Sequence, residues 1–234
     1  MSPVPFFSDL NFILQSGLLI CQVRRWGKLV AEQRVSFDDE PLSWQPTLDT
    51  FLSDYPSIST CRLQLGAPYV QWFTAIWPAT ITNKNDLTAY LQYQANQHLG
   101  SQSFHHGASA TPPTTDWQVG FHARAQPGES LLVAAIDASL LLQWQSRVVS
   151  HHKKLKSVQP LLLSSWPKDI QRVNSSTLLA FEEPPLTTLV AYQDQTCFGV
   201  RIVRRLSNDR AQVEQYAKAL SFAVDAIRYV QVKP

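Results

Sequence analysis

The chain has 234 residues, 44% of them hydrophobic, which is enough for one large domain or two packed lobes with a substantial core. Twenty basic against eighteen acidic residues leave a net charge of +2, too small to predict general binding to nucleic acid or acidic membranes. The three cysteines form no Cys-x-x-Cys pair, which favours a reducing compartment. No stretch has the pattern of a secretion signal or a membrane anchor. We therefore expect a cytoplasmic protein that does not insert into the membrane.

The first part of the chain predicts three consecutive strands between Asn11 and Phe37, joined by two tight turns. In the third strand, apolar and polar residues alternate from Leu29 to Phe37, which is typical of a strand with one buried face. A short amphipathic helix from about Gln45 and a fourth strand that ends at Gly66 follow. This order predicts a βββαβ lobe, to which we assign residues 1–68.

The middle part, residues 69–136, predicts a small inserted αβ subdomain with a return strand. It starts with a strand over Tyr69 to Trp77 and ends with a continuously apolar strand from Leu131 to Ile136, a pattern that predicts burial on both faces. Between them, one helix has a stripe of Leu87, Leu91, Ala95 and Leu99. Residues 100–116 are small, polar and rich in proline, so we expect a mobile surface loop there.

The last part, residues 137–234, predicts a second lobe. It begins with a helix capped by Asp137 and continues with a second three-stranded meander over Ser176 to Ile202. A long amphipathic helix is expected from Ser207 to Ile227, and a final strand over Tyr229 to Val232. A chain that twice forms three strands and then a helix predicts two related αβ lobes.

Known nucleotide-binding and hydrolase motifs are missing from the sequence. The eight glycines all lie more than two residues apart, so there is neither a dinucleotide fingerprint nor a Walker A loop. No Gly-x-Ser-x-Gly elbow exists, and no Ser-Asp-His grouping has a local signature. The pairs His105-His106 and His151-His152 have no Cys or carboxylate at ligand spacing. We therefore predict no catalytic residue of these kinds and no metal site.

An acidic pair, Glu182 and Glu183, ends the first strand of the second meander. Paired carboxylates can hold Mg²⁺ or act as acid and base. Pro184 and Pro185 follow, and they remove two backbone N–H groups that a phosphate-binding turn would need. A surface hairpin is therefore favoured over a catalytic dyad.

The order of the predicted elements resembles the actin-like ATPase superfamily, which has a ribonuclease-H-like α/β fold with two βββαβα-type lobes. The run LLVAAIDASLLLQWQSRVVSHHKKLKSVQPLLL, residues 131–163, is similar to a segment of PilM-type proteins and of the cytoplasmic part of GspL-type proteins. The run LLAFEEPPLTTLVAYQDQTCFGVRI, residues 178–202, resembles their second phosphate hairpin. The resemblance covers nearly the whole chain and rests on element order and apolar pattern.

The sequence departs from the nucleotide contacts that the resemblance implies. Where nucleotide-binding members carry Asp-x-Gly in the first turn, this chain has Gln15, Ser16 and Gly17. Where they carry a second Asp-x-Gly and a Thr or Ser, this chain has Phe181, Glu182 and Glu183, with only Thr187 retained in type. No glycine follows Gly199, so the late Gly-Gly adenosine loop has no candidate. We therefore expect no cofactor.

The resemblance implies a non-hydrolysing pseudo-ATPase that serves as a scaffold of a type IV pilus or type II secretion machine. Such a scaffold would dock the cytoplasmic tail of an inner-membrane assembly protein and contact the assembly ATPase, and it would sit at the inner membrane through that partner. Two alternatives remain open. One is an ATP-binding protein of this fold with Glu182, Glu183 and Thr187 as atypical ligands. The other is a ribonuclease-H-like nuclease, which needs a carboxylate inside the first strand.

Overall fold

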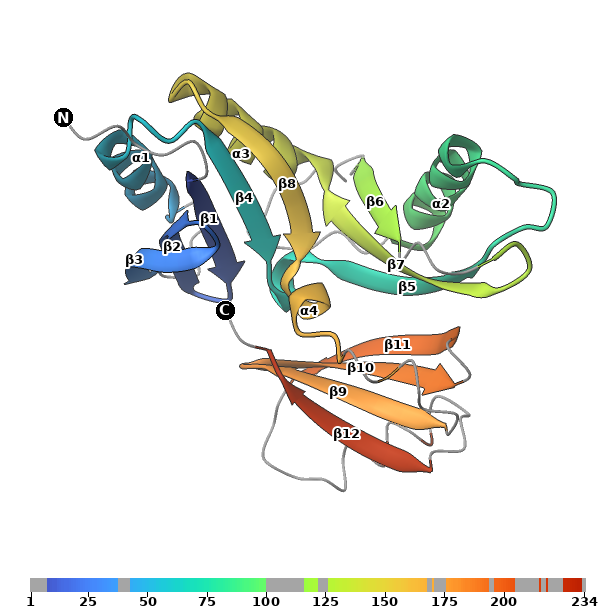
Figure 1. The fold of residues 1–234 in the computed structure, drawn as a ribbon. Helices are drawn as coiled ribbons and strands as arrows, with labels where there is room; N and C mark the ends of the chain where they lie inside the picture. Colours follow the sequence, from blue (N-terminus) through green and yellow to red (C-terminus); the bar gives the residue numbers. More distant parts are fainter. Residues whose placement is uncertain are drawn as a thin grey trace, which may run out of the picture.

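The computed structural model describes residues 8–37, 43–99, 116–121, 126–167, 170, 176–193, 196–204, 215, 218 and 225–232. Three β-sheets with packed helices form this part of the chain (Figure 1). The loop expected over 100–116 lies outside the described residues except for Asp116, and so does most of the helix expected after Ser207. Among the described residues, no helix combines the length and the apolar character needed to cross a membrane.

The first sheet has five strands in the order β3-β2-β1-β4-β8. The three antiparallel strands are β1 (Ser8–Gln15), β2 (Leu18–Arg25) and β3 (Lys28–Ser36), while β4 (Thr60–Leu65) and β8 (Lys154–Pro160) continue the sheet in parallel. This confirms the first predicted meander. It forms because β1 and β2 each have a run of five buried residues, β3 is exposed at the edge, and each turn contains a glycine with positive φ.

Two helices cover one face of the first sheet, namely α1 (Gln45–Asp54) and α3 (Ala138–Ser150). Asp137 caps α3 as expected, because its side chain accepts a hydrogen bond from the Ser139 N–H at 2.7 Å. The indole of Trp144 is fully buried and stacks on Trp44 with ring centroids 4.6 Å apart. These contacts tie α3 to the first lobe.

Residues 137–160 therefore pair and pack differently from the sequence expectation, which grouped them with the second lobe. Strand β8 extends the first sheet, with Leu63 of β4 opposite Val158. Parallel neighbours are joined through a crossover rather than a turn, so no local pattern along the chain indicates this partner. We keep the limits 1–68, 69–136 and 137–234 as a proposed division of the chain, with 137–160 packed against the first lobe.

The second sheet has the strand order β5-β7-β6 and is built from the part of the chain that we propose to be an inserted αβ subdomain. Its strands are β5 (Gln71–Ile76), β6 (Trp117–Phe121) and β7 (Ser130–Asp137), and α2 (Lys84–Leu99) packs on it through the predicted apolar stripe. Strand β7 is buried on both faces, as its apolar run predicts, since alternate residues belong to different core clusters. The first strand starts at Gln71 instead of Tyr69 because a short 3₁₀ turn, Ala67–Tyr69, precedes it.

The third sheet has the order β11-β10-β9-β12 and confirms the second predicted meander. Its strands are β9 (Thr177–Glu183), β10 (Leu186–Gln193), β11 (Thr196–Arg204) and β12 (Ala226–Gln231). The final strand is confirmed, but the expectation that Ile227 ends a helix is wrong. Ile227 pairs with Leu178 in a parallel ladder and packs on the face of the sheet that holds Ala180.

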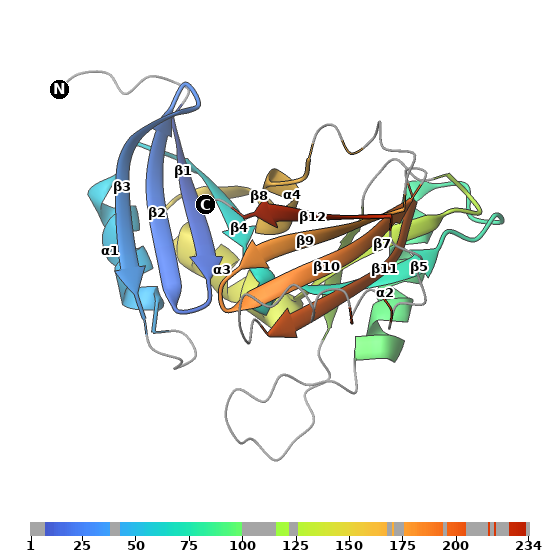
Figure 2. The same cartoon turned by 90° about the horizontal axis from the view of Figure 1, so that it is seen from below.

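The two lobes meet in a shared apolar core. Ile13 and Ile20 of the first sheet belong to the same buried cluster as Phe181 of the third sheet, and residues of the short helix α4 (Leu161–Ser164) complete that cluster. Figure 2 shows the third sheet running beside β1 and β4 toward the second sheet. The turns of both expected phosphate hairpins, β1–β2 and β9–β10, lie at this meeting of the lobes.

Candidate functional site

The candidate site is the place where three strand ends meet, which we call the hairpin junction: Leu14, Gln15, Gly66, Ala67 and Glu183. The ends of β1 and β4 are joined by a hydrogen bond from the Gly66 N–H to the Leu14 carbonyl at 2.8 Å. The hydroxyl of Tyr69, at the end of the 3₁₀ turn, lies 3.5 Å from the Gln15 carbonyl oxygen. The resemblance to actin-like ATPases implies that the phosphates of a nucleotide would lie beside the turns of the β1–β2 and β9–β10 hairpins.

The first turn, Ser16-Gly17, is a tight hairpin with no acidic side chain. Gly17 has φ of +63°, a conformation that residues with a β-carbon rarely adopt. Its carbonyl accepts a hydrogen bond from the Phe37 N–H at 2.9 Å, which closes the base of the meander. The glycine thus has a structural role, and the Gln15 side chain stands where the resemblance implies an aspartate.

The second hairpin sends Glu183 into the junction. Its Oε2 accepts a hydrogen bond from the Ala67 N–H at 2.9 Å, and the residue is only 4% exposed. The neighbouring Gly66 has no side chain, and a β-carbon there would overlap Glu183 Oε1. A carboxyl group of the second hairpin therefore fills a space that the first lobe leaves open for it.

Burial decides the protonation of this group. Loss of solvent raises the pKa of Glu183, while the Ala67 N–H and the Gln15 amide oppose that rise. Oε1 has no hydrogen-bond partner among the described residues, so half of the carboxyl group is unsatisfied as an anion. Burial thus shifts the Glu183 carboxyl group toward its neutral form. The five residues of the hairpin junction include no positive charge that could bind an anion such as a phosphate.

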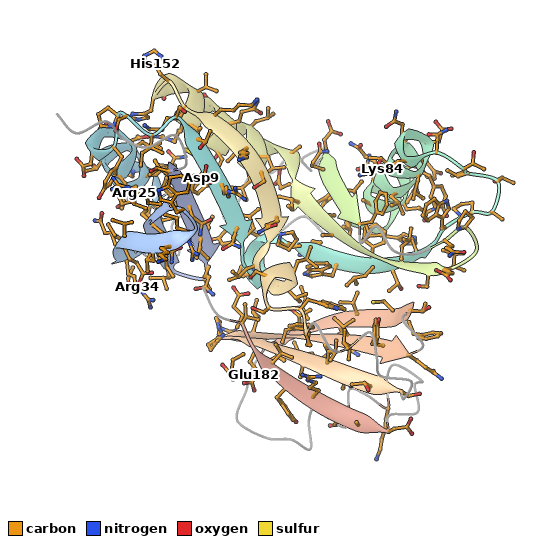
Figure 3. All side chains as sticks on the ribbon, in the orientation of Figure 1. Asp9, Arg25, Arg34, Lys84, His152 and Glu182 are labelled. Carbon is orange, nitrogen blue, oxygen red and sulfur yellow. The ribbon has the colours of Figure 1, made fainter. Side chains whose placement is uncertain are left out.

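The other two candidate ligands lie on the opposite face of the hairpin. Thr187 is directly across from Glu182, while Glu183 is across from Leu186. Because successive residues of a strand point to opposite faces, Glu182 and Thr187 share one face and Glu183 the other. The Glu182 carboxylate accepts a hydrogen bond from the Gln231 side chain on β12. Figure 3 labels Glu182 at the end of the third sheet that lies toward the first sheet. The structure therefore does not bring these three residues together.

In the described ranges, no three His, Cys, Asp or Glu residues gather as a metal site would require. His105 and His106 lie outside those ranges. The described pair, His151 and His152, ends α3, and His152 adopts a positive φ of 56° as the chain leaves the helix.

The structure does bring together a Ser, a His and an Asp that no sequence signature could indicate. His151 Nε2 lies 3.4 Å from Asp49 Oδ1, and its Nδ1 lies 3.5 Å from Ser53 Oγ. The Ser53 hydroxyl donates to the Asp49 carbonyl at 2.9 Å, so its hydrogen is engaged within α1. Arg147 also pairs with Asp49. This group holds α1 against the end of α3 and lacks an activated hydroxyl.

The single carboxylate of the first strand is Asp9, at its start. Burial disfavours its ionisation, but hydrogen bonds from Thr60 at 2.5 Å and from Arg62 at 3.1 Å outweigh burial, so the pKa of Asp9 is lowered. Within the strand the central positions are Asn11, Phe12 and Ile13. Asp9 is thus held in a structural ion pair with β4.

Solved structures with the same arrangement of elements are known. The cytoplasmic domain of EpsL, an inner membrane component of the type II secretion system of Vibrio cholerae, matches with a TM-score of 0.57 and 14% identity, covering 97% of this chain and 83% of that one. The PilM–PilN type IV pilus biogenesis complex matches with a TM-score of 0.58 and 12% identity, over 94% of this chain and 67% of that one. A Bacteroides thetaiotaomicron protein with an actin-like ATPase fold and unknown function matches with 0.56 and 12%, over 95% and 81%.

The chain therefore has the actin-like ATPase fold, and the fold class expected from the sequence is confirmed. At this level of identity the likeness establishes the fold, while function has to be argued from the site. No family model matches the sequence, and no curated protein matches it.

Proposed function

We propose that this protein is a non-catalytic, actin-like adaptor of a type IV pilus or type II secretion-like machine. It works on the cytoplasmic side of the inner membrane and docks the cytoplasmic tail of an inner-membrane assembly protein. Through the same assembly it contacts the assembly ATPase. It binds no nucleic acid and reaches the membrane only through its protein partner.

The likeness over almost the full chain supports the setting of this proposal. Two of the similar structures are, by their descriptions, an inner membrane component of a secretion system and a pilus biogenesis complex of two proteins. Both match the fold of this chain with TM-scores of 0.57 and 0.58. A fold that is used as a binding partner in one assembly can keep that role when its catalytic site is lost.

The single observation that carries the non-catalytic reading is the buried carboxyl group of Glu183 at the Ala67 N–H. In this fold the hairpin turns would surround the phosphates, but here one turn contributes a carboxyl group to that space. A triphosphate would have to displace this carboxyl group, and none of the five residues of the hairpin junction carries a positive charge to balance its phosphates. The following Pro184 and Pro185 have no N–H groups to donate.

The rival ATP-binding reading makes a different prediction. It needs Glu182, Glu183 and Thr187 to act on one ligand, although they lie on two faces of the hairpin. Isothermal titration of the purified chain with Mg-ATP tests it directly. We expect no saturable heat at millimolar nucleotide, and micromolar binding that Glu183→Gln weakens would overturn the proposal.

The docking role is tested in the cells that produce the protein. A photo-crosslinking residue placed at exposed positions across the surface should yield a crosslink to an inner-membrane assembly protein through its cytoplasmic tail. Truncation of that tail should abolish the crosslink while leaving the level of this protein unchanged. Crosslinks to soluble enzymes alone, with none to a membrane protein, would contradict the docking role.

A further inference from the structure

The outer edge of the first sheet is strand β3, which no other described strand covers. Strand β3 has no buried residue along its nine positions, whereas every other strand of that sheet has at least one. Leu29 is 50% exposed and Val30 58% exposed. Among the described residues, β3 pairs only with β2, so its far side faces outward, as both views show (Figures 1 and 2). Exposed edges of this kind can accept a further strand.

The pairing of β3 with β2 is regular over most of the strand and irregular near the turn. The register with β2 shifts between Val23 and Arg24, so that Val30 is an extra residue and bulges from the ladder. From Ala31 to Ser36 the pairing is continuous. A partner strand would therefore pair with Ala31–Ser36 and end at the bulge.

In an antiparallel strand, successive backbone N–H groups point to opposite sides, so half of those on β3 can bind a partner strand. The Phe37 N–H donates inward to Gly17, so the N–H groups at Val35, Gln33 and Ala31 also point toward β2. Those of Glu32, Arg34 and Ser36 therefore point outward. Three outward N–H groups at alternate residues are what a strand needs for addition.

Charge indicates the chemistry of the partner. The β2–β3 hairpin carries Arg24, Arg25, Lys28 and Arg34 against Glu32 alone, so four positive charges minus one negative charge give +3. The whole chain has only +2, so the positive charge is concentrated here. Glu32 is already engaged, since its carboxylate accepts from Arg34 at 2.6 Å and from Gln22 at 2.8 Å.

The two faces of β3 differ. Ala31 belongs to the side that packs toward α1 and the first core cluster, whereas Glu32 and Arg34 lie on the opposite side with Gln22. A strand added at this edge would place alternate side chains on these two sides. Acidic residues would meet Arg34 and Arg24, and apolar residues would extend the apolar side beside Ala31 and Val35.

We propose that β3 is a docking edge for an extended segment of a partner protein in which apolar and acidic residues alternate. The segment adds a sixth strand to the first sheet at Ala31–Ser36. This inference rests on the proposed docking role and names the surface and the chemistry of the partner. It can fail while the adaptor role stands, because the tail could dock elsewhere.

The test uses the full chain and a short capped peptide that alternates valine with glutamate as the probe. Amide chemical shifts of the labelled protein should change at β2 and β3 on titration to millimolar peptide. A peptide that alternates valine with lysine should bind at least about tenfold more weakly, since its charges oppose those of the hairpin. A valine-glutamate peptide with alternate N-methyl groups should not bind, because it cannot complete the ladder.

Variants test the same contacts from the protein side. Arg34→Glu should weaken binding by about tenfold because it reverses a charge next to the added strand. The matched control is Lys84→Glu on α2, which makes the same charge change at the opposite end of the molecule and should leave binding unchanged (Figure 3). Ser36→Pro removes one outward N–H without altering charge and should also weaken binding. If that variant does not fold, the N-methylated peptide tests the same hydrogen bonds.

Several results would overturn the inference. Equal binding of the lysine and glutamate peptides would contradict the charge argument, and equal binding of the N-methylated peptide would contradict strand addition. A dimer of the free chain that Ser36→Pro dissociates would assign the edge to a second copy. Binding to anionic vesicles that Arg34→Glu abolishes would assign it to a lipid surface. A positive titration with Mg-ATP would refute the adaptor role without changing any of these outcomes.

Discussion

Glu183 and Ala67 are separated by 116 residues, yet Oε2 of the one lies 2.9 Å from the backbone nitrogen of the other. The contact joins the turn of the second hairpin to the end of β4 in the first lobe. Gly66 makes it possible, because a side chain there would occupy the same space as the carboxyl group. The two lobes are thus joined at the hairpin junction by a buried hydrogen bond.

The first prediction concerns this steric fit. Gly66→Ala should destabilise the fold by about 1–3 kcal/mol, because its β-carbon overlaps Glu183 Oε1. In a Glu183→Ala background the same change should cost less, since the overlapping atoms are gone. Urea unfolding of the natural protein, the two single variants and the double variant measures the coupling free energy between the two positions. Gly120→Ala is the matched control, as a β-carbon at Gly120 meets no atom within 4 Å. A cost at Gly66 that is the same in both backgrounds would refute the contact.

The second prediction concerns pH. Burial raises the pKa of Glu183 in the folded state above its ordinary value of 4.5. The stability that the protonated group contributes is complete below that value and is lost as the pH rises through the folded pKa. The free energy of unfolding of the natural protein, relative to Glu183→Gln, should therefore fall as the pH rises above 4.5. Urea unfolding from about pH 4 to pH 8 measures this difference, and other carboxylates cancel in it. A difference that grows with pH would show that the carboxylate is stabilised as an anion.

The third prediction concerns the packing of α3 on the first lobe. Trp144 is fully buried and stacks on Trp44, so Trp144→Ala should cost about 3–5 kcal/mol. Leu142, two residues earlier on the same helix, is 64% exposed, and Leu142→Ala should change stability by about 0.5 kcal/mol or less. Thermal or urea unfolding compares the two. Similar costs at both sites would contradict the placement of α3.

The fourth prediction concerns the thiols. Burial raises the pKa of Cys21, Cys61 and Cys197 to about 12, and all three are free and buried. Since the thiolate is the reactive form, Ellman's reagent near about pH 8 should modify none of them in the folded protein. In denaturant it should titrate all three. Fast modification of one thiol under native conditions would show that its strand opens locally.

The sequence predicted the two meanders because their signals are local. Short apolar runs and, from Leu29 to Phe37, alternation of apolar and polar residues predict the strands, while Gly17 and Gly27, both with positive φ, set the turns of the first meander. The apolar run from Leu131 to Ile136 likewise predicted a strand buried on both faces, which the structure confirms. These features depend only on residues close together in the chain.

Features that depend on distant contacts were not predictable in the same way. The pairing of β8 with β4 joins residues far apart in the chain, such as Leu63 and Val158, 95 positions later, and no turn specifies it. Ile227, expected at the end of a helix, lies in β12 instead, because it finds an edge beside Leu178 that its own apolar spacing could not reveal. The local apolar spacing favours a helix at Ile227, whereas pairing with β9 favours a strand, and the strand forms because of this long-range pairing.

From the sequence alone follow the order of the elements and the residues that stand in each hairpin turn, because turn chemistry is set within a few residues. Glu183 could be recognised there as out of place for a phosphate, but not as buried. Only the tertiary structure decides that its carboxyl group enters the gap at Gly66 and meets the Ala67 N–H. The physical reason is that burial and hydrogen bonding between lobes depend on which surfaces the folded chain brings together, and the spacing of residues along the chain does not contain that information.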